Sequence, residues 1–118
     1  MSLDVYLRED VKCPHCKESI PYGDELYSAN ITHNLGKMAA EAGIYKHLWR
    51  PDEIKITKAR QLIKPLQKGL AKLIAEPDRY KAFDAPNGWG LYIHFVPFVS
   101  LYLAACEKFP KATVSVSR

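Results

Sequence analysis

The sequence predicts an α+β fold in which a small three-stranded antiparallel sheet is covered on one face by three to four helices. Segments at the two ends of the chain alternate apolar and polar residues, which is typical of strands with one buried face. The middle of the chain places apolar residues three and four positions apart, which is typical of helices packed on a core. With 118 residues, 47% of them hydrophobic, the chain is predicted to form a single globular domain over residues 1–118.

The predicted strands cover residues 3–7, 25–29 and 112–116. Between the first two lies an excursion over residues 9–23, which contains two cysteines and ends in a turn sequence with proline and glycine. The sequence therefore predicts a long hairpin whose tip carries the cysteines and lies away from the core.

A first helix is predicted to end at Gly43, with Thr32 or Asn34 as its N-cap. A second apolar stripe begins after Thr57, a possible cap, and stays in phase across Pro65. It predicts one kinked helix, or alternatively two helices that meet at this proline.

The last part of the chain is predicted to alternate between helix and loop. Residues 77–83 form a short helical turn, and residues 84–90 form a loop because they contain the sequence Pro-Asn-Gly-Trp-Gly. A final helix over residues 91–108 buries Val96, Val99, Leu103 and Cys106, and it tolerates Pro97 if that residue lies near its first turns.

Composition limits the classes of partner and compartment. The 17 basic and 13 acidic residues give a net charge of +4, which weakly favours anionic partners and is mild for a dedicated nucleic-acid-binding protein. The N-terminal sequence MSLDVYLRED lacks the apolar core of a signal peptide, and no stretch of 18 apolar residues occurs. We therefore expect a protein of the cytoplasm that does not bind membranes. An odd number of cysteines in that compartment favours metal ligation or burial over a disulfide.

Cys13 and Cys16 have the spacing of half a zinc site. The predicted third ligand is His33, which follows the strand that leaves the hairpin, and His15 or a water molecule completes the set around one Zn²⁺ ion. The alternatives are two free thiols at an exposed hairpin tip, a metal site completed by a second chain, and a redox pair.

The segment Asn30-Ile31-Thr32-His33-Asn34 gathers hydrogen-bonding side chains where a strand meets a helix. Such a junction can receive an anion or orient His33 for proton transfer. Alternatively, Thr32 or Asn34 only caps the helix and His33 is an ordinary surface residue. No Ser, Cys or carboxylate stands at a recognisable nucleophile spacing, so no catalytic residue is assigned.

Two tryptophans lie beside polar residues that suit ligand binding. Trp49 precedes Arg50, and Trp89 follows Asn87 in the Gly-rich loop. Together they are candidates for a pocket that stacks on and holds a phosphorylated, nucleotide-like ligand. The alternative is that both rings fill the gap between the helices and the sheet.

A row of four cations runs along the predicted second helix at a spacing of four residues: Arg60, Lys64, Lys68 and Lys72. A row of this kind can follow a phosphate backbone. The alternative is an ordinary solvated helix face, since no aromatic residues are interleaved for base stacking.

Six segments spread over almost the whole chain carry a resemblance: SLDVYL, ANITHNLGKMAAEAGIY with the trailing LWRPDE, ITKARQLIKPLQKGLAKL, NGWG, LAACEKFP and VSVSR. In these segments the chain resembles a family of small proteins encoded by bacteriophages and prophages. The resemblance implies that the cysteine excursion is an addition to the family pattern. It implies a shared framework of candidate ligand-binding residues, namely Asn30, His33, Asn34, Trp49, Arg50, Asn87 and Trp89.

The first functional hypothesis is a phage accessory protein that binds its target stoichiometrically. The target would be a host defence protein or a small phosphorylated ligand, and the protein would act in the cytoplasm of the host cell. The alternatives are a zinc-stabilised module that contacts nucleic acid and a small enzyme that acts on a nucleotide-like phosphate ester with His33 as general base. The oligomeric state is left open.

Overall fold

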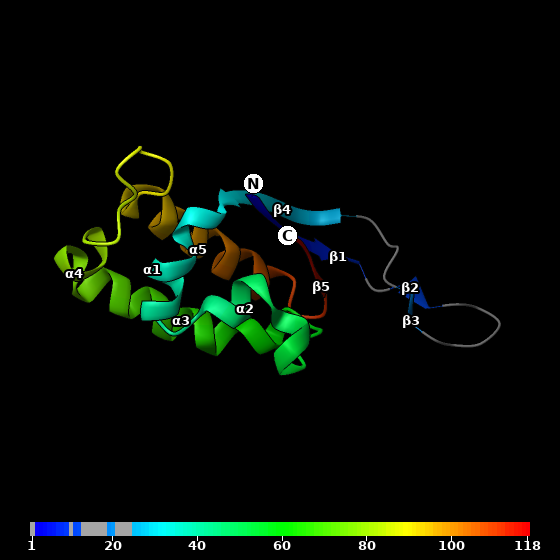
Figure 1. Cartoon of the computed structure of the whole chain (residues 1–118). Coiled ribbons are helices and arrows are strands. Elements are labelled where there is room, and N and C mark those ends of the chain that lie inside the picture. The colour runs from blue at the N-terminus through cyan, green and yellow to red at the C-terminus, as the bar shows by residue number, and fades with distance from the viewer. Residues whose placement is uncertain (1, 10, 13–18, 21–24) are drawn as a thin grey trace.

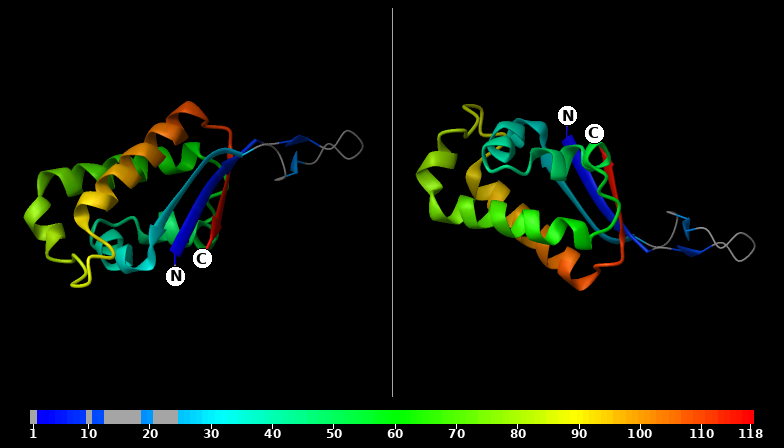
Figure 2. Two further views of the ribbon diagram at one scale, coloured as in Figure 1. Left: turned by 90° about the horizontal axis from the view of Figure 1, so that it is seen from above. Right: turned by 90° about the horizontal axis from the view of Figure 1, so that it is seen from below.

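The computed structural model describes residues 2–9, 11–12, 19–20 and 25–118. Strand β1 (Ser2–Arg8) lies in the middle of a three-stranded sheet, between β4 (Glu25–Thr32) and β5 (Thr113–Ser117). Both pairings are antiparallel, and helices pack on one face of the sheet (Figures 1 and 2). The predicted α+β fold is confirmed.

The alternation of the first strand sets which face of the sheet meets the helices. Leu3, Val5 and Leu7 have no exposed surface, whereas the residues between them are half-buried on the opposite face. Strand β4 extends beyond the predicted 25–29, because Ile31 pairs with Leu3 and buries its side chain beside it. Asn30 and Thr32 therefore lie on the strand itself.

Two short strands, β2 (Val11–Lys12) and β3 (Ser19–Ile20), pair with each other in a second sheet within the excursion. The pairing agrees with a hairpin. Cys13, His15 and Cys16 lie outside the described residues.

The helical part lies between β4 and β5 and begins with short elements. In chain order the elements are η1 (His33–Leu35), α1 (Gly36–Glu41), α2 (Tyr45–Trp49), η2 (Pro51–Ile54), α3 (Arg60–Ala75), α4 (Pro77–Lys81) and α5 (Tyr92–Lys108). Gly43, with φ of 78°, follows the end of α1 as predicted. Pro65 lies inside α3, so the segment is one helix, and the alternative of two helices is wrong.

The long helix α5 packs along α3 and contributes much of the core. Val99, Leu103 and Cys106 are buried as predicted, but Val96 is only half-buried because it lies at the edge of the packed face. Burial raises the pKa of the Cys106 thiol to about 12, so this thiol stays protonated at neutral pH and is a core residue. Among the described residues, no helix is both long and apolar enough to cross a membrane.

The start of α3 is capped from inside the helix. The side-chain oxygen of Gln61 accepts hydrogen bonds from the backbone N–H groups of Thr57 at 2.8 Å and Lys58 at 2.9 Å. The predicted cap by Thr57 is wrong, because the helix begins at Arg60 and the Thr57 hydroxyl itself donates a long hydrogen bond, of 3.4 Å, to the same Gln61 oxygen.

Replacing Gln61 by alanine is therefore expected to lower the free energy of unfolding by about 1 to 2 kcal/mol, because two backbone donors lose their acceptor. The matched control is Gln67→Ala, which removes an exposed glutamine from the same helix and is expected to cost less than about 0.5 kcal/mol. Urea unfolding of the two variants measures the difference, and equal stabilities would contradict the capping role.

Candidate functional site

Residues 84–90 form a loop between α4 and α5 that packs against the junction of β4 and η1. The side-chain amide of Asn34 donates a hydrogen bond to the backbone oxygen of Trp89 at 2.8 Å. Gly90 is buried at this contact, with φ of 114°, and a Cβ atom placed there would lie 2.9 Å from the Cβ of Asn34. Glycine is required here both by the backbone conformation and by the close approach.

Hydrogen bonds within the loop hold its backbone in place. The Trp89 N–H donates to the Asn87 side-chain oxygen at 3.0 Å, and the Gly88 N–H donates to the backbone oxygen of Ala85 at 3.0 Å. At the start of α5, the Tyr92 N–H donates to the Asp84 carboxylate at 2.7 Å. The loop is therefore a defined structure, and it holds the Trp89 ring in the solvent with 70% of its surface exposed.

Open clefts lie on two sides of this loop. One cleft of about 520 Å³ is lined by His33, Asn34 and Lys37 together with residues 83–87. A second, of about 600 Å³, is bounded by the β4 residues 30–32, by Trp89 and Gly90, and by His94 of α5. Trp89 and Asn87 also border a cleft of about 550 Å³ with Thr32, His33 and Asn34. Five of the predicted site residues are thereby brought together: Asn30, His33, Asn34, Asn87 and Trp89.

A hydrogen bond from Trp49 orients the ring of His33. The indole Nε1–H donates a hydrogen bond to Nδ1 of His33 at 2.8 Å. Since Nδ1 accepts this bond, the neutral imidazole must carry its proton on Nε2. His33 can therefore offer an N–H donor to the cleft that it lines.

Trp49 itself is a core residue, as the alternative interpretation predicted for it. Its ring is only 2% exposed and stacks on Tyr45, with ring centroids 5.4 Å apart and an angle of 9° between the planes. The same interpretation is wrong for Trp89, because that ring fills no gap between the helices and the sheet.

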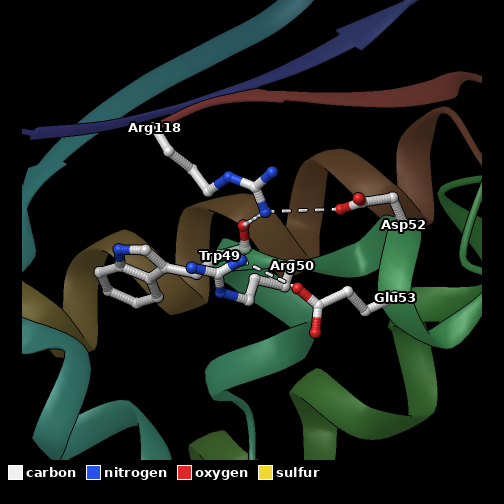
Figure 3. Close-up of polar contacts among 5 residues, drawn as sticks. All are labelled: Trp49, Arg50, Asp52, Glu53 and Arg118. Carbon is white, nitrogen blue, oxygen red and sulfur yellow. Dashed lines mark hydrogen bonds and ion pairs between the residues drawn. The ribbon is translucent and has the colours of Figure 1, made fainter.

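Arg50 does not line any of these three clefts beside the 84–90 loop. Its guanidinium forms an ion pair with Glu53 at 2.9 Å, and hydrogen bonds to Tyr45 and then Glu53 raise its pKa above the usual value (Figure 3). Figure 3 also shows Arg118, which donates to the backbone oxygen of Trp49 at 3.1 Å and lies 3.6 Å from the Asp52 carboxylate. These two arginines stabilise the segment that follows α2. Their partners Tyr45, Trp49, Asp52 and Glu53 lie far from the 84–90 loop in the sequence.

Asn30 donates a hydrogen bond to Asp4 on the neighbouring strand at 2.7 Å, so its side chain is held by β1. Three ionisable residues of these clefts were not predicted as site residues from the sequence, namely Lys37, Asp84 and His94. Lys37 lies one turn after His33, and this spacing is the only signal in the sequence that points to it.

Of the three proposed zinc ligands, only His33 lies among the described residues. His33 follows the end of β4 that is remote from the excursion, and the strand between them is roughly 25 Å long. Cys13 and Cys16 lie outside the described residues. Among the described residues there is no group of three His, Cys, Asp or Glu side chains that could hold a metal ion. The zinc site thus stays a prediction.

Three comparisons with known proteins, against family models, curated sequences and solved structures, found no match for this chain. The resemblance to phage and prophage proteins likewise stays a prediction.

Proposed function

We propose that this protein acts by stoichiometric binding of a protein partner, with Trp89 as the central anchor. The observation that supports this function is a large aromatic ring, 70% exposed, on a loop whose backbone is held by hydrogen bonds and a buried glycine. Exposed tryptophans on fixed backbones suit protein interfaces, because they bury much apolar surface and lose little conformational entropy on binding.

The open clefts on both sides of the ring favour a protein over a small ligand. A small molecule is usually bound in a concave site that covers most of its surface. Here the Trp89 ring borders two open clefts, and polar side chains of Thr32, His33 and Asn34 line one of them together with it. An apolar centre with a polar rim is the usual composition of a protein interface.

The contact between Trp49 and His33 supports a binding role over a catalytic one. A general base must present an unprotonated nitrogen to its substrate. In His33 the unprotonated Nδ1 is occupied by the indole N–H, and Nε2 carries the proton. This tautomer suits donation of a hydrogen bond to a carbonyl or carboxylate of the partner.

The resemblance to phage and prophage proteins suggests which partner to test first. A protein of such a family would act in the cytoplasm of the host, where a component of a host defence system is the expected target. In this proposal one copy of the chain covers one copy of the target and blocks it.

Replacing Trp89 by alanine is expected to weaken capture of the partner at least 30-fold, because truncation of a central aromatic anchor typically costs about 2 kcal/mol or more. The tagged wild-type chain and its variants are expressed in bacterial cells, and the proteins that bind in an equimolar ratio are quantified by mass spectrometry. The matched control is Ile74→Ala, which removes another exposed apolar side chain, 61% exposed on α3. Both variants are expected to unfold within about 0.5 kcal/mol of wild type.

Equal recovery of the partner by wild type and Trp89→Ala would overturn this assignment. A native mass spectrum of the untreated chain that contains a small phosphorylated molecule, lost in the Trp89 variant, would replace the protein partner by a ligand of that class.

A further inference from the structure

Helix α3 carries the whole net charge of the chain. Its 16 residues include Arg60, Lys64, Lys68 and Lys72 and no Asp or Glu. The full sequence has 17 basic and 13 acidic residues, so removal of these four cations leaves 13 of each sign. The excess positive charge is therefore concentrated on one helix.

The four cations lie on the solvent face of α3. All four are exposed, whereas Leu62, Leu66, Gly69 and Leu73 on the opposite face are buried. Since four residues of helix correspond to a rotation of about 40° beyond one turn, the four charges stay in one sector and follow each other about 6 Å apart. The row is roughly 18 Å long.

Among the described residues, no ion pair neutralises a cation of the α3 row. The ion pairs of Arg50, Arg79 and Arg118 lie on other segments. The helix therefore presents four uncompensated positive charges. Figures 1 and 2 show α3 on a different side of the molecule from the 84–90 loop.

We propose that the exposed face of α3 binds the phosphate backbone of double-stranded DNA without sequence preference. Duplex DNA carries one negative charge per about 1.7 Å of its axis, so the row lies against a dense line of phosphates along its whole length. The exposed face lacks the bulky apolar residues that insertion into a membrane surface requires, apart from Ile74 near the end of the helix. It also lacks aromatic rings for stacking on single-stranded bases, which favours a duplex.

This surface is separate from the one proposed for the protein partner, and the two proposals fail independently. Substitutions on α3 leave Trp89 and its loop unchanged, and Trp89→Ala leaves the cationic row unchanged.

The test is the salt dependence of binding to a fluorescent 20-base-pair DNA duplex, measured by fluorescence anisotropy with the full chain. Four phosphate contacts predict a slope of log K against log salt of about −3.6, which corresponds to a loss of roughly 150-fold in affinity between 50 and 200 mM salt. The double variant Lys64→Gln and Lys68→Gln is expected to halve this slope, to about −1.8. Duplexes of unrelated sequence should bind equally well.

The matched control neutralises two exposed lysines elsewhere, Lys46→Gln and Lys111→Gln, and so gives the same net charge. It is expected to keep a slope near the wild-type value of about −3.6. Absence of binding at 50 mM salt, or equal loss in both double variants, would overturn the proposal. Polyglutamate of matched charge that competes as well as unlabelled duplex would also overturn it, because the surface would then bind acidic polypeptides.

Discussion

Replacing Trp49 by alanine is expected to lower the free energy of unfolding by about 3 to 5 kcal/mol, the range for loss of a large buried aromatic side chain. Trp49 is 2% exposed, and its indole ring stacks on Tyr45 and donates the indole N–H to His33. The substitution removes the ring and its contacts at once, and leaves His33 without the donor that orients it. Urea unfolding followed by circular dichroism measures the loss.

The conservative variant Trp49→Phe separates packing from hydrogen bonding. It keeps an aromatic ring beside Tyr45 and removes the donor to Nδ1 of His33, so the expected cost is smaller, about 1 to 3 kcal/mol. In ¹⁵N spectra, the wild-type imidazole is expected to be held as the Nε2–H tautomer, and the variant should show a mixture of the two tautomers. A cost below about 1 kcal/mol for Trp49→Ala, or an unchanged His33 tautomer in Trp49→Phe, would contradict the role of this contact.

The second large effect is expected from Gly90→Ala, which should destabilise the protein by about 2 to 4 kcal/mol, as a strained backbone and an overpacked contact combine. The backbone at Gly90 has φ of 114°, and an added Cβ would lie 2.9 Å from the Asn34 side chain and 3.3 Å from the Thr32 methyl group. Relief of this contact must move the loop and break the hydrogen bond from Asn34 to Trp89.

The neighbouring Gly88 provides a matched control. It also has a positive φ, 76°, but an added Cβ there would meet nothing within 4 Å. Gly88→Ala is therefore expected to cost only the backbone term, about 1 to 2 kcal/mol. Thermal unfolding of both variants gives the difference. If both variants lost the same free energy of unfolding, the contact of Gly90 with Asn34 would not fix the loop. The proposal that Trp89 is held in place before it binds would then lose its support.

Local patterns were sufficient for most of the fold. The alternation of Leu3, Val5 and Leu7 predicted a strand with one buried face, and the apolar stripe of α3 predicted one helix through Pro65. Such patterns are readable because side chains in strands and helices repeat with fixed periods of 2 and 3.6 residues. The sequence offered Thr57 as a possible cap of α3, whereas the structure uses Gln61, since both residues can supply an oxygen and only the path of the backbone chooses between them.

The candidate site was predictable only in its residue types. The sequence by itself determined that Asn30, His33 and Asn34 follow each other and that Trp89 stands in a glycine-rich loop. Only the tertiary structure decided that this loop packs on that junction, because the contact of Asn34 with Trp89 joins segments that are 55 residues apart. It also decided that Trp49 is buried while Trp89 is exposed, and that Arg50 pairs with Glu53 outside the clefts. Burial and pairing of this kind depend on which distant segments meet in space, and no local period in a sequence records that.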